Sequence, residues 1–581
     1  MAFIYGKRLL GIALAQAALV SLPAAVNAAT VVNPLCPANT AAFNPTAAPE
    51  IVVPEGFTAS VFASGLNFPT GIAFLGNNGH FQVFVLESGH GLPSACNDQS
   101  AFGSGDFDPT NPFTPDILVF DQSGNKILGP LAKPTADGSG LQPEGPAVDL
   151  AFEHGLEGGR LFATDSNQAT HAHNGQNNSS RIVTVDPTTG KVTPLITQLP
   201  TGDHPTEQLA FKDNWIYWSQ GSTTNSGVVG LDNGGGENQP DIPCQDIVLS
   251  SNLFDSGENV LTSGYSPFGM QRPGATVPAF SGAAHHGVCD GAILRAKLSD
   301  AHPENTIEPF SWGYRNGYAI AFAPDDHPLK GELLVGEDGP DERGARPTNN
   351  APDLLQVAKQ NPDGSPDYHG WPDRFGFLAS SQAVFNPVGG PSDDLCVPDP
   401  SNPPSLCTPA SLAQILSEDV PIRDVLDHPP QAIISPLAIE AADSSFTGIA
   451  FVPHSFVGGP VARDAALYTL EGDFGFSAPN ATDPAPEVGH EVKLINFSGE
   501  PAALNIQGFA RNQTGDQAFI TGVNGFNRPT NIRFGPDGCA WVVDYGAVRD
   551  LGKDTHFVGP PQNGPLLQIP HTGVIWRICP Q

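Results

Sequence analysis

The chain has few cations for its size. Its 581 residues contain 26 Lys and Arg against 60 Asp and Glu, which gives a formal net charge of −34. A chain this acidic is repelled by phosphate backbones and by anionic lipid headgroups, so we expect no nucleic-acid partner and no binding to an anionic membrane. Any cationic cluster that the fold builds in such a chain is therefore of interest as a binding site for an anion.

Long apolar runs are also scarce. The longest begins the chain, where residues 9–22 follow Lys7 and Arg8 and are shorter than a typical membrane span. Together with the small residues at 26–28, this run predicts a secretory signal peptide over residues 1–28. Nothing later resembles a membrane span, so we expect a secreted protein, periplasmic or extracellular.

Closely spaced cysteine pairs are missing as well. No Cys-x-x-Cys occurs, which argues against a zinc ribbon and against covalently attached c-type haem. An even number of cysteines, eight, favours disulfides in an exported chain. We predict a disulfide between Cys396 and Cys407, which would close a Pro/Ser/Asp-rich loop, and leave the pairing of the others open.

Helical periodicity is hard to find, and turn residues are abundant. Gly and Pro number 64 and 58, and the apolar runs are short and rich in β-branched and aromatic residues, as is typical of an all-β chain. One short phrase ending in Phe recurs. Its six copies are Thr70–Phe74, Val148–Phe152, Glu207–Phe211, Tyr318–Phe322, Thr447–Phe451 and Thr530–Phe534.

Each copy of the phrase is followed, after a turn-rich gap, by a second short apolar run. Six such paired-strand units predict a six-bladed β-propeller over residues 51–581, after a poorly ordered lead-in at residues 29–50. We expect residues 57–62 to pair with residues 573–578, so that an N-terminal strand closes the last blade. The surplus residues near 222–300 and 373–440 are predicted to form long loops.

Propeller geometry indicates which distant residues share a face. The first strand of a blade crosses from one face to the other and the second returns, so residues before a first strand lie near residues after a second strand. This predicts one face carrying residues that precede three of the first strands, and others that follow a second strand: His204, Arg315, Asn316, Arg528, Gly339 and Pro340.

Three motifs occur in a fixed order within the chain. They are Tyr314–Phe322 with its Arg-Asn pair, the acidic run Glu337–Glu342 with Gly-Pro, and Asp367–Pro372 ending in Gly-Trp-Pro. The chain resembles, on these motifs and on its last strand, the soluble glucose/sorbosone dehydrogenase family. That resemblance implies oxidation of the anomeric carbon of an aldose or related sugar, with pyrroloquinoline quinone as hydride acceptor and an external acceptor for the electrons.

The resemblance also implies roles for individual residues. His204 matches the family's catalytic base, and the adjacent Asp203 could orient its ring or raise its basicity. Glu144 sits where the family has a polar residue near the sugar. The remaining matches are to cofactor-binding and calcium-binding positions: Arg315, Asn316 and Arg528 for the quinone, and the backbone carbonyls of Gly339 and Pro340 for calcium.

The chain departs from this family at two cationic positions. Thr530 stands where the glucose enzymes have a second Arg, and the segment around Glu471 replaces one that carries a Lys. Both changes remove positive charge from the place where a tricarboxylate cofactor would bind. Arg343, Arg346 or Arg533 could supply the missing charge.

Two other functions stay open at this point. A calcium-dependent propeller hydrolase, such as a lactonase, would need a ring of acids and amides around a central ion, and a non-catalytic propeller would bind glycan or protein through its loops. Histidine pairs at 171/173 and 285/286 could also bind a transition metal, although further ligands at recognisable spacing are lacking. The acids at second-strand ends that could form the calcium ring are Glu87, Asp165, Glu337, Glu471 and Asp544.

Overall fold

A computed structural model gives the arrangement of the chain. It describes residues 30–32, 40–46, 49–89, 111–135, 137–143, 145–168, 178–230, 239–256, 260–280, 287–340, 345–346, 351–379, 424–441, 443–472, 488–498, 503–515, 524–550 and 566–581. The predicted signal peptide, Glu144, Cys396, Cys407 and the histidine pairs lie outside these residues.

The described chain is built from strands, which confirms the all-β prediction. Its helical segments are three short 3-10 turns, η3 (Gly155–Glu157), η5 (Pro303–Thr306) and η6 (His454–Phe456). Within the described ranges, no helix is long and apolar enough to cross a membrane.

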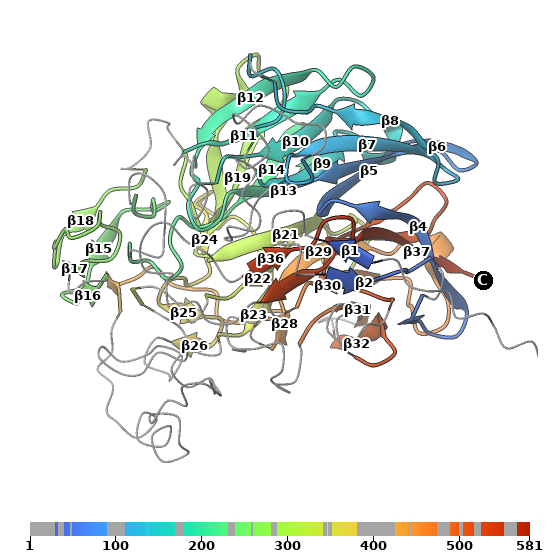
Figure 1. Ribbon diagram of the computed structural model, residues 1–581. Coiled ribbons are helices and arrows are strands. Elements are labelled where there is room, and N and C mark those ends of the chain that lie inside the picture. The colour runs from blue at the N-terminus through green and yellow to red at the C-terminus, as the bar shows by residue number, and fades with distance from the viewer. Residues whose placement is uncertain are drawn as a thin grey trace, which may run out of the picture.

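Six antiparallel sheets of four or five strands make up the body of the molecule (Figure 1). Sheet 1 contains β5 (Pro69–Asn77), β6 (His80–Glu87), β7 (Asp116–Asp121) and β8 (Lys126–Leu131). Sheet 2 contains β9 (Ala147–Phe152), β10 (Leu161–Asp165), β11 (Ser180–Val185) and β12 (Val192–Leu199). Sheet 3 contains β13 (Thr206–Lys212), β14 (Trp215–Gln220), β19 (Ala292–Lys297), β20 (Glu308–Trp312) and the parallel β24 (Asp367–Tyr368).

The second half of the chain repeats this pattern. Sheet 4 contains β21 (Asn316–Phe322), β22 (Leu333–Asp338), β23 (Asp353–Ala358) and β28 (Ala438–Glu440). Sheet 5 contains β29 (Phe446–Phe451), β30 (Ala465–Leu470), β31 (Glu491–Ser498), β32 (Ala503–Asn512) and β3 (Ile51–Val52). Sheet 6 contains β33 (Pro529–Phe534), β34 (Ala540–Asp544), β37 (Gly573–Pro580) and β4 (Phe57–Leu66).

The recurring phrase supplies the first strand of every sheet. Each first strand contacts the first strand of the next sheet, and β33 of sheet 6 contacts β5 of sheet 1. The Phe that ends each copy packs against a ring of the preceding sheet. These ring pairs are Phe74–Trp541, Phe152–Phe84, Phe211–Phe162, Phe322–Tyr217, Phe451–His327 and Phe534–Phe456. Because aromatic contacts add to the burial of apolar area, the repeated Phe joins neighbouring sheets.

The N-terminal and C-terminal segments meet in sheet 6. Strand β4 pairs with β37, with Val61 opposite Trp576 and Ala63 opposite Ile575. This pairing confirms the predicted contact between residues 57–62 and 573–578. A disulfide between Cys539 and Cys579 also joins the start of β34 to β37.

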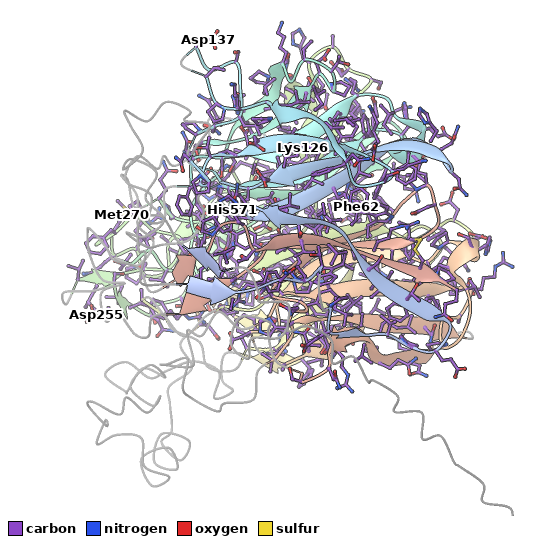
Figure 2. All side chains as sticks on the ribbon, turned by 45° about the vertical axis from the view of Figure 1, so that its right-hand side comes forward. Phe62, Lys126, Asp137, Asp255, Met270 and His571 are labelled. Atoms are coloured by element: carbon purple, nitrogen blue, oxygen red, sulfur yellow. A yellow bond between two sulfur atoms is a disulfide. The ribbon has the colours of Figure 1, made fainter. Side chains whose placement is uncertain are left out.

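Short strands outside the six sheets form the long loops. The loop between β14 and β19 projects to one side of the sheets, where Figure 2 labels Asp255 and Met270. A disulfide between Cys244 and Cys289 joins the middle of this loop to the segment just before β19. The other short strands are β1 (Thr30–Val32), β2 (Thr40–Ala42), β15 (Ile247–Leu249), β16 (Phe254–Asp255), β17 (Leu261–Thr262), β18 (Thr276–Val277), β25 (Arg374–Phe375), β26 (Leu378–Ala379), β27 (Leu426–Asp427), β35 (Val548–Asp550) and β36 (Leu566–Gln568).

Candidate functional site

The loop before β13 holds His204 against the segment that follows β14. The His204 amide donates to the Ser222 carbonyl at 3.0 Å, and the Asp203 amide donates to the Thr223 carbonyl at 2.9 Å. Gly221 is required for this close approach, because a Cβ at that position would lie 2.2 Å from the Cβ of His204. The imidazole is therefore held on a rigid loop, and its side chain remains 19% exposed.

His204 lies between two carboxyl groups. Its Nε2 is 3.5 Å from Oδ2 of Asp203, and its Nδ1 is 3.5 Å from Oε1 of Glu207. Burial raises the pKa of Glu207, although contact with His204 opposes the shift. Our sequence prediction included Asp203 but missed Glu207, which the β-bulge between Thr206 and the rest of β13 brings round to the imidazole.

The Arg315 guanidinium connects the His204 loop to sheet 4. Its Nη2 donates to Oδ2 of Asp203 at 3.1 Å, and its Nη1 donates to the Gly339 carbonyl at 2.8 Å. Asp203 therefore contacts the predicted base on one side and a buried cation on the other. Five of the residues predicted to share a face lie at the ends of β13, β21 and β22: His204, Arg315, Asn316, Gly339 and Pro340. Asp203 precedes His204 at the same end of β13.

Asn316 follows Arg315 at the start of β21. Its Nδ2 donates to Oδ2 of Asp338 at 3.2 Å, and its amide oxygen has no hydrogen-bond partner among the described residues. The residue is only 2% exposed. A buried amide oxygen without a partner is costly, so this group is available to a ligand.

A buried hydrogen-bond chain links the three motifs behind Arg315. The Arg315 amide donates to Oε1 of Glu337 at 3.0 Å, and the other Glu337 oxygen accepts from the Gln356 amide. Oε1 of Gln356 in turn lies 2.5 Å from Nδ1 of His369, whose ring stacks on Tyr314 with centroids 4.6 Å apart. Burial raises the pKa of Glu337 to about 8, so this carboxyl is largely protonated at neutral pH. His369 is therefore connected to the Arg315 backbone through Gln356 and Glu337.

Arg528 lies between sheets 5 and 6. Its Nη1 donates to the Gly472 carbonyl at 2.9 Å, and its amide donates to Oδ1 of Asp544 at 2.8 Å. Burial raises the pKa of the nearby Glu471 to about 7, although the charge of Arg528 opposes this shift. Burial and the same guanidinium lower the pKa of His490 to about 3, so its imidazole is neutral.

Tyr318 lies on β21, two residues after Asn316. Burial raises the pKa of its hydroxyl, and the charges of Glu207, Glu471 and Asp338 raise it further. Glu207 belongs to the His204 side and Glu471 to the Arg528 side. The two sides therefore share one electrostatic environment around Tyr318.

The described cations proposed as replacements are engaged elsewhere. Arg346 forms a buried ion pair with Asp373 at 2.7 Å. Arg533 forms a two-pronged ion pair with Asp149, at 2.6 and 2.7 Å. Arg343 lies outside the described residues. The hydroxyl of Thr530 donates to the Pro69 carbonyl at 3.2 Å, so it too serves the sheet contacts.

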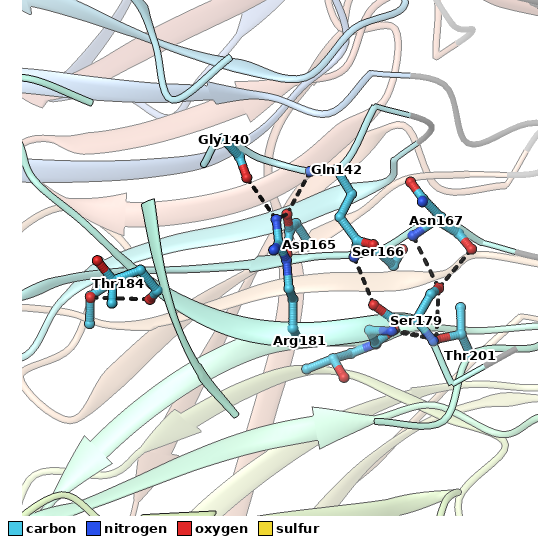
Figure 3. Close-up of polar contacts among 12 residues, drawn as sticks. Gly140, Gln142, Asp165, Ser166, Asn167, Ser179, Arg181, Thr184 and Thr201 are labelled. Carbon is cyan, nitrogen blue, oxygen red and sulfur yellow. Dashed lines mark hydrogen bonds and ion pairs between the residues drawn. The ribbon is translucent and has the colours of Figure 1, made fainter. Parts of the chain in front are cut away.

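Most acids at second-strand ends bind the loops of their own sheets. In sheet 2, Asp165 accepts from the Gln142 amide and from the guanidinium of Arg181 (Figure 3). Glu87, Glu337 and Asp544 likewise accept backbone N–H groups of the loop that enters their sheet. Within the described ranges, ligands of the His, Cys, Asp and Glu type gather in threes only at Asp537, Cys539 and Cys579, where both cysteines form a disulfide.

Comparison with known proteins finds no matching family model and no matching curated protein. Solved structures of sugar-oxidising enzymes are similar over most of the chain, but at low identity. The pyranose dehydrogenase PQQ domain of Coprinopsis cinerea shares 12% identity over 91% of this chain and 97% of its own, with a TM-score of 0.43. A Trichoderma reesei enzyme of carbohydrate-active family AA12 shares 14% over 92% and 98%, with a TM-score of 0.45.

A bacterial structure shows the same level of similarity. The PQQ-bound aldose sugar dehydrogenase of Streptomyces coelicolor shares 14% identity over 91% of this chain and all of its own, with a TM-score of 0.39. At these identities and scores, similarity assigns neither a family nor an activity to the chain.

Proposed function

We propose that the chain is a six-bladed β-propeller oxidoreductase that oxidises the anomeric carbon of an aldose or related sugar. Its proposed cofactors are pyrroloquinoline quinone and calcium, and its electrons pass to an external acceptor. The contact set of His204, Asp203, Arg315 and the Gly339 carbonyl carries this proposal, because it joins a base, an orienting acid and a buried cation from separate segments. The ring of first-strand contacts supports the propeller.

The residues at the Arg315 end fit the cofactor and its cation. The guanidinium of Arg315 can donate a hydrogen bond to a quinone oxygen, and the unpartnered amide oxygen of Asn316 can accept one from an N–H or O–H group of the cofactor. The carbonyl of Gly339 already accepts one bond from Arg315, and its second lone pair can bind a calcium ion together with the Pro340 carbonyl. Arg528 would contact the far end of the cofactor, and Glu144 would contact the sugar.

The chain's own residues supply the base. We propose that one ring nitrogen of His204 accepts the proton of the sugar hydroxyl while the other nitrogen is hydrogen-bonded to a carboxyl group. The imidazolium that results lies between Asp203 and Glu207, which stabilise its charge. When bound, the quinone supplies the hydride acceptor. Arg315 holds the Asp203 carboxyl group in place during this proton transfer.

A calcium-dependent hydrolase fits the contacts less well. It needs side-chain oxygens gathered around a central ion, whereas Asp165, Glu337, Glu87 and Asp544 bind the loops of their own sheets.

We also propose that the chain is exported and cleaved after residue 28. The two disulfides among the described residues support an oxidising compartment.

Reconstitution tests the proposed function. Apoprotein is incubated with pyrroloquinoline quinone and calcium, and dye reduction is measured with a panel of aldoses. We expect reduction that depends on both cofactors, with His204→Ala abolishing turnover and leaving cofactor binding nearly intact. His428→Ala is the matched control, since that side chain is 89% exposed. Absence of any cofactor-dependent signal, or a non-catalytic protein that only binds glycan, would refute the proposal.

A further inference from the structure

Two uncharged polar side chains, His490 and Asn527, lie beside Arg528. Nδ1 of His490 lies 2.8 Å from the Asn527 carbonyl, and since a carbonyl only accepts, Nδ1 carries the proton. Nε2 is then a lone-pair acceptor that makes no hydrogen bond among the described residues, although the Glu471 backbone lies close to the ring. His490 is 2% exposed. This imidazole would repel an anion and accept a hydrogen bond from a neutral group.

Asn527 provides a second unsatisfied group. Its side chain is 1% exposed, and neither its amide oxygen nor its amide nitrogen has a partner among the described residues. A buried amide group that forms no hydrogen bond costs stability. A ligand group that both donates and accepts a hydrogen bond would satisfy it.

Glu471 sets the charge at this end. It is 9% exposed and precedes Gly472, whose carbonyl holds Arg528 and whose Cα lies against the His490 ring. The charge of Arg528 acts on the Glu471 carboxyl group, and neither His490 nor Asn527 adds positive charge. A ligand carboxylate bound here would meet a single cation, Arg528, whose charge already acts on Glu471.

We infer that the end of the site formed by Glu471, His490, Asn527 and Arg528 binds an uncharged hydrogen-bonding group rather than ionised carboxylates. The inference rests on the proposed sugar oxidation and departs from the proposed function in one point, the ionised carboxylates of the quinone. The chain would prefer a planar quinone with fewer ionised carboxylates to pyrroloquinoline quinone itself. Because Glu471 gains charge as the pH rises through its pKa of about 7, binding of an anionic quinone would weaken above neutral pH.

Other titratable groups act on Glu471 and enter this pH dependence. Arg528 favours its ionised form, whereas Asp544 opposes it, and both are buried. Glu471 in turn raises the pKa of Tyr318, Tyr545 and Asp338. His490 stays neutral throughout, since its pKa is about 3. Replacing Glu471 therefore tests the pH dependence of binding of the anionic quinone.

A binding titration that requires no turnover tests the inference. Quenching of tryptophan fluorescence is followed while apoprotein with calcium is titrated with pyrroloquinoline quinone or with its trimethyl ester, at pH 6 and pH 8. For the unaltered chain we expect the ester to bind about tenfold more tightly than the acid at pH 8. We also expect affinity for the acid to fall about tenfold between pH 6 and pH 8.

Variants of Glu471 provide the controls. Glu471→Lys should raise affinity for the acid at pH 8 at least about tenfold, and the milder Glu471→Gln should remove the pH dependence. Glu157→Lys makes the same charge change at an exposed position on η3 and should change neither affinity.

The outcomes separate the inference from the proposed function. Tighter binding of the acid than of the ester at pH 8, with no gain in Glu471→Lys, overturns the inference and leaves a quinoprotein. Binding of neither compound to any variant overturns the inference together with the proposed cofactor.

Discussion

Arg533 of sheet 6 forms a two-pronged ion pair with Asp149 of sheet 2, across the region where the first strands meet. The Arg533 side chain also donates to the carbonyls of Ile72 and Leu150, while Asp149 accepts from the Leu209 amide and is fully buried. Four sheets are thus connected through one ion pair.

Replacing Arg533 should destabilise the fold. Arg533→Met leaves the Asp149 carboxylate buried without its cation, and we expect unfolding free energy to fall by about 3 kcal/mol. Urea unfolding measures this change. Arg463→Ala removes an exposed ion pair with Asp326 and should cost below about 1 kcal/mol. Equal effects of the two variants would contradict a bridging role for Arg533.

Stability should fall as the pH rises, in part because of Glu87. Burial raises its pKa from 4.5 in the unfolded chain to about 7. Between these values the folded state holds a proton that the unfolded state has lost, so folding is favoured at low pH and the advantage disappears as pH rises through 7. The full difference corresponds to about 3 kcal/mol.

Glu87→Gln tests this contribution, and it also removes the Glu87 charge that raises the pKa of the neighbouring Asp116. Gln keeps an acceptor for the Asn67 amide, and it cannot ionise. The variant should match the unaltered chain at pH 5 and exceed its stability at pH 8, by urea unfolding. Glu157→Gln, at an exposed position, should track the unaltered chain at both values. A constant difference between Glu87→Gln and the unaltered chain would exclude the titration.

Much of the fold could be predicted because it repeats. Six phrases with a terminal Phe reveal the first strands, and the Phe contacts now explain why that residue recurs. The partner of Arg533 could not be predicted, because Asp149 is 384 residues away and no spacing rule connects them. Disulfide pairing was likewise hidden, since connectivity depends on which loops meet in space.

The candidate site was only partly visible in the sequence. Residues before first strands could be grouped because propeller geometry puts them on one face. Glu207 was missed because the alternation of side chains in a regular strand does not predict its contact with His204. The contact depends on the β-bulge at the start of β13. Gln356 was missed because it lies in β23, outside the three motifs, and its contacts with Glu337 and His369 join two of them.

The disulfide in sheet 6 should contribute to the stability of the whole fold. Cys539 and Cys579 are 40 residues apart, and their bond restricts the unfolded chain while joining the start of β34 to the neighbouring strand β37. We expect Cys539→Ser with Cys579→Ser to lower unfolding free energy by about 2–4 kcal/mol. Urea unfolding without reductant measures it, and an unchanged midpoint would show that strand pairing alone closes the sheet.

The two acids beside His204 should differ in what they do for catalysis. Glu207→Gln keeps the size of the side chain and removes the carboxylate near Nδ1, so we expect kcat to fall about 10- to 100-fold with little change in KM. Asp203→Asn also leaves Arg315 without its anionic partner, so both kcat and cofactor affinity should fall. Asp213→Asn, at an exposed turn after β13, is the control. Steady-state dye reduction and fluorescence titration with the quinone separate these effects, and loss of cofactor affinity in Glu207→Gln alone would reverse the two assignments.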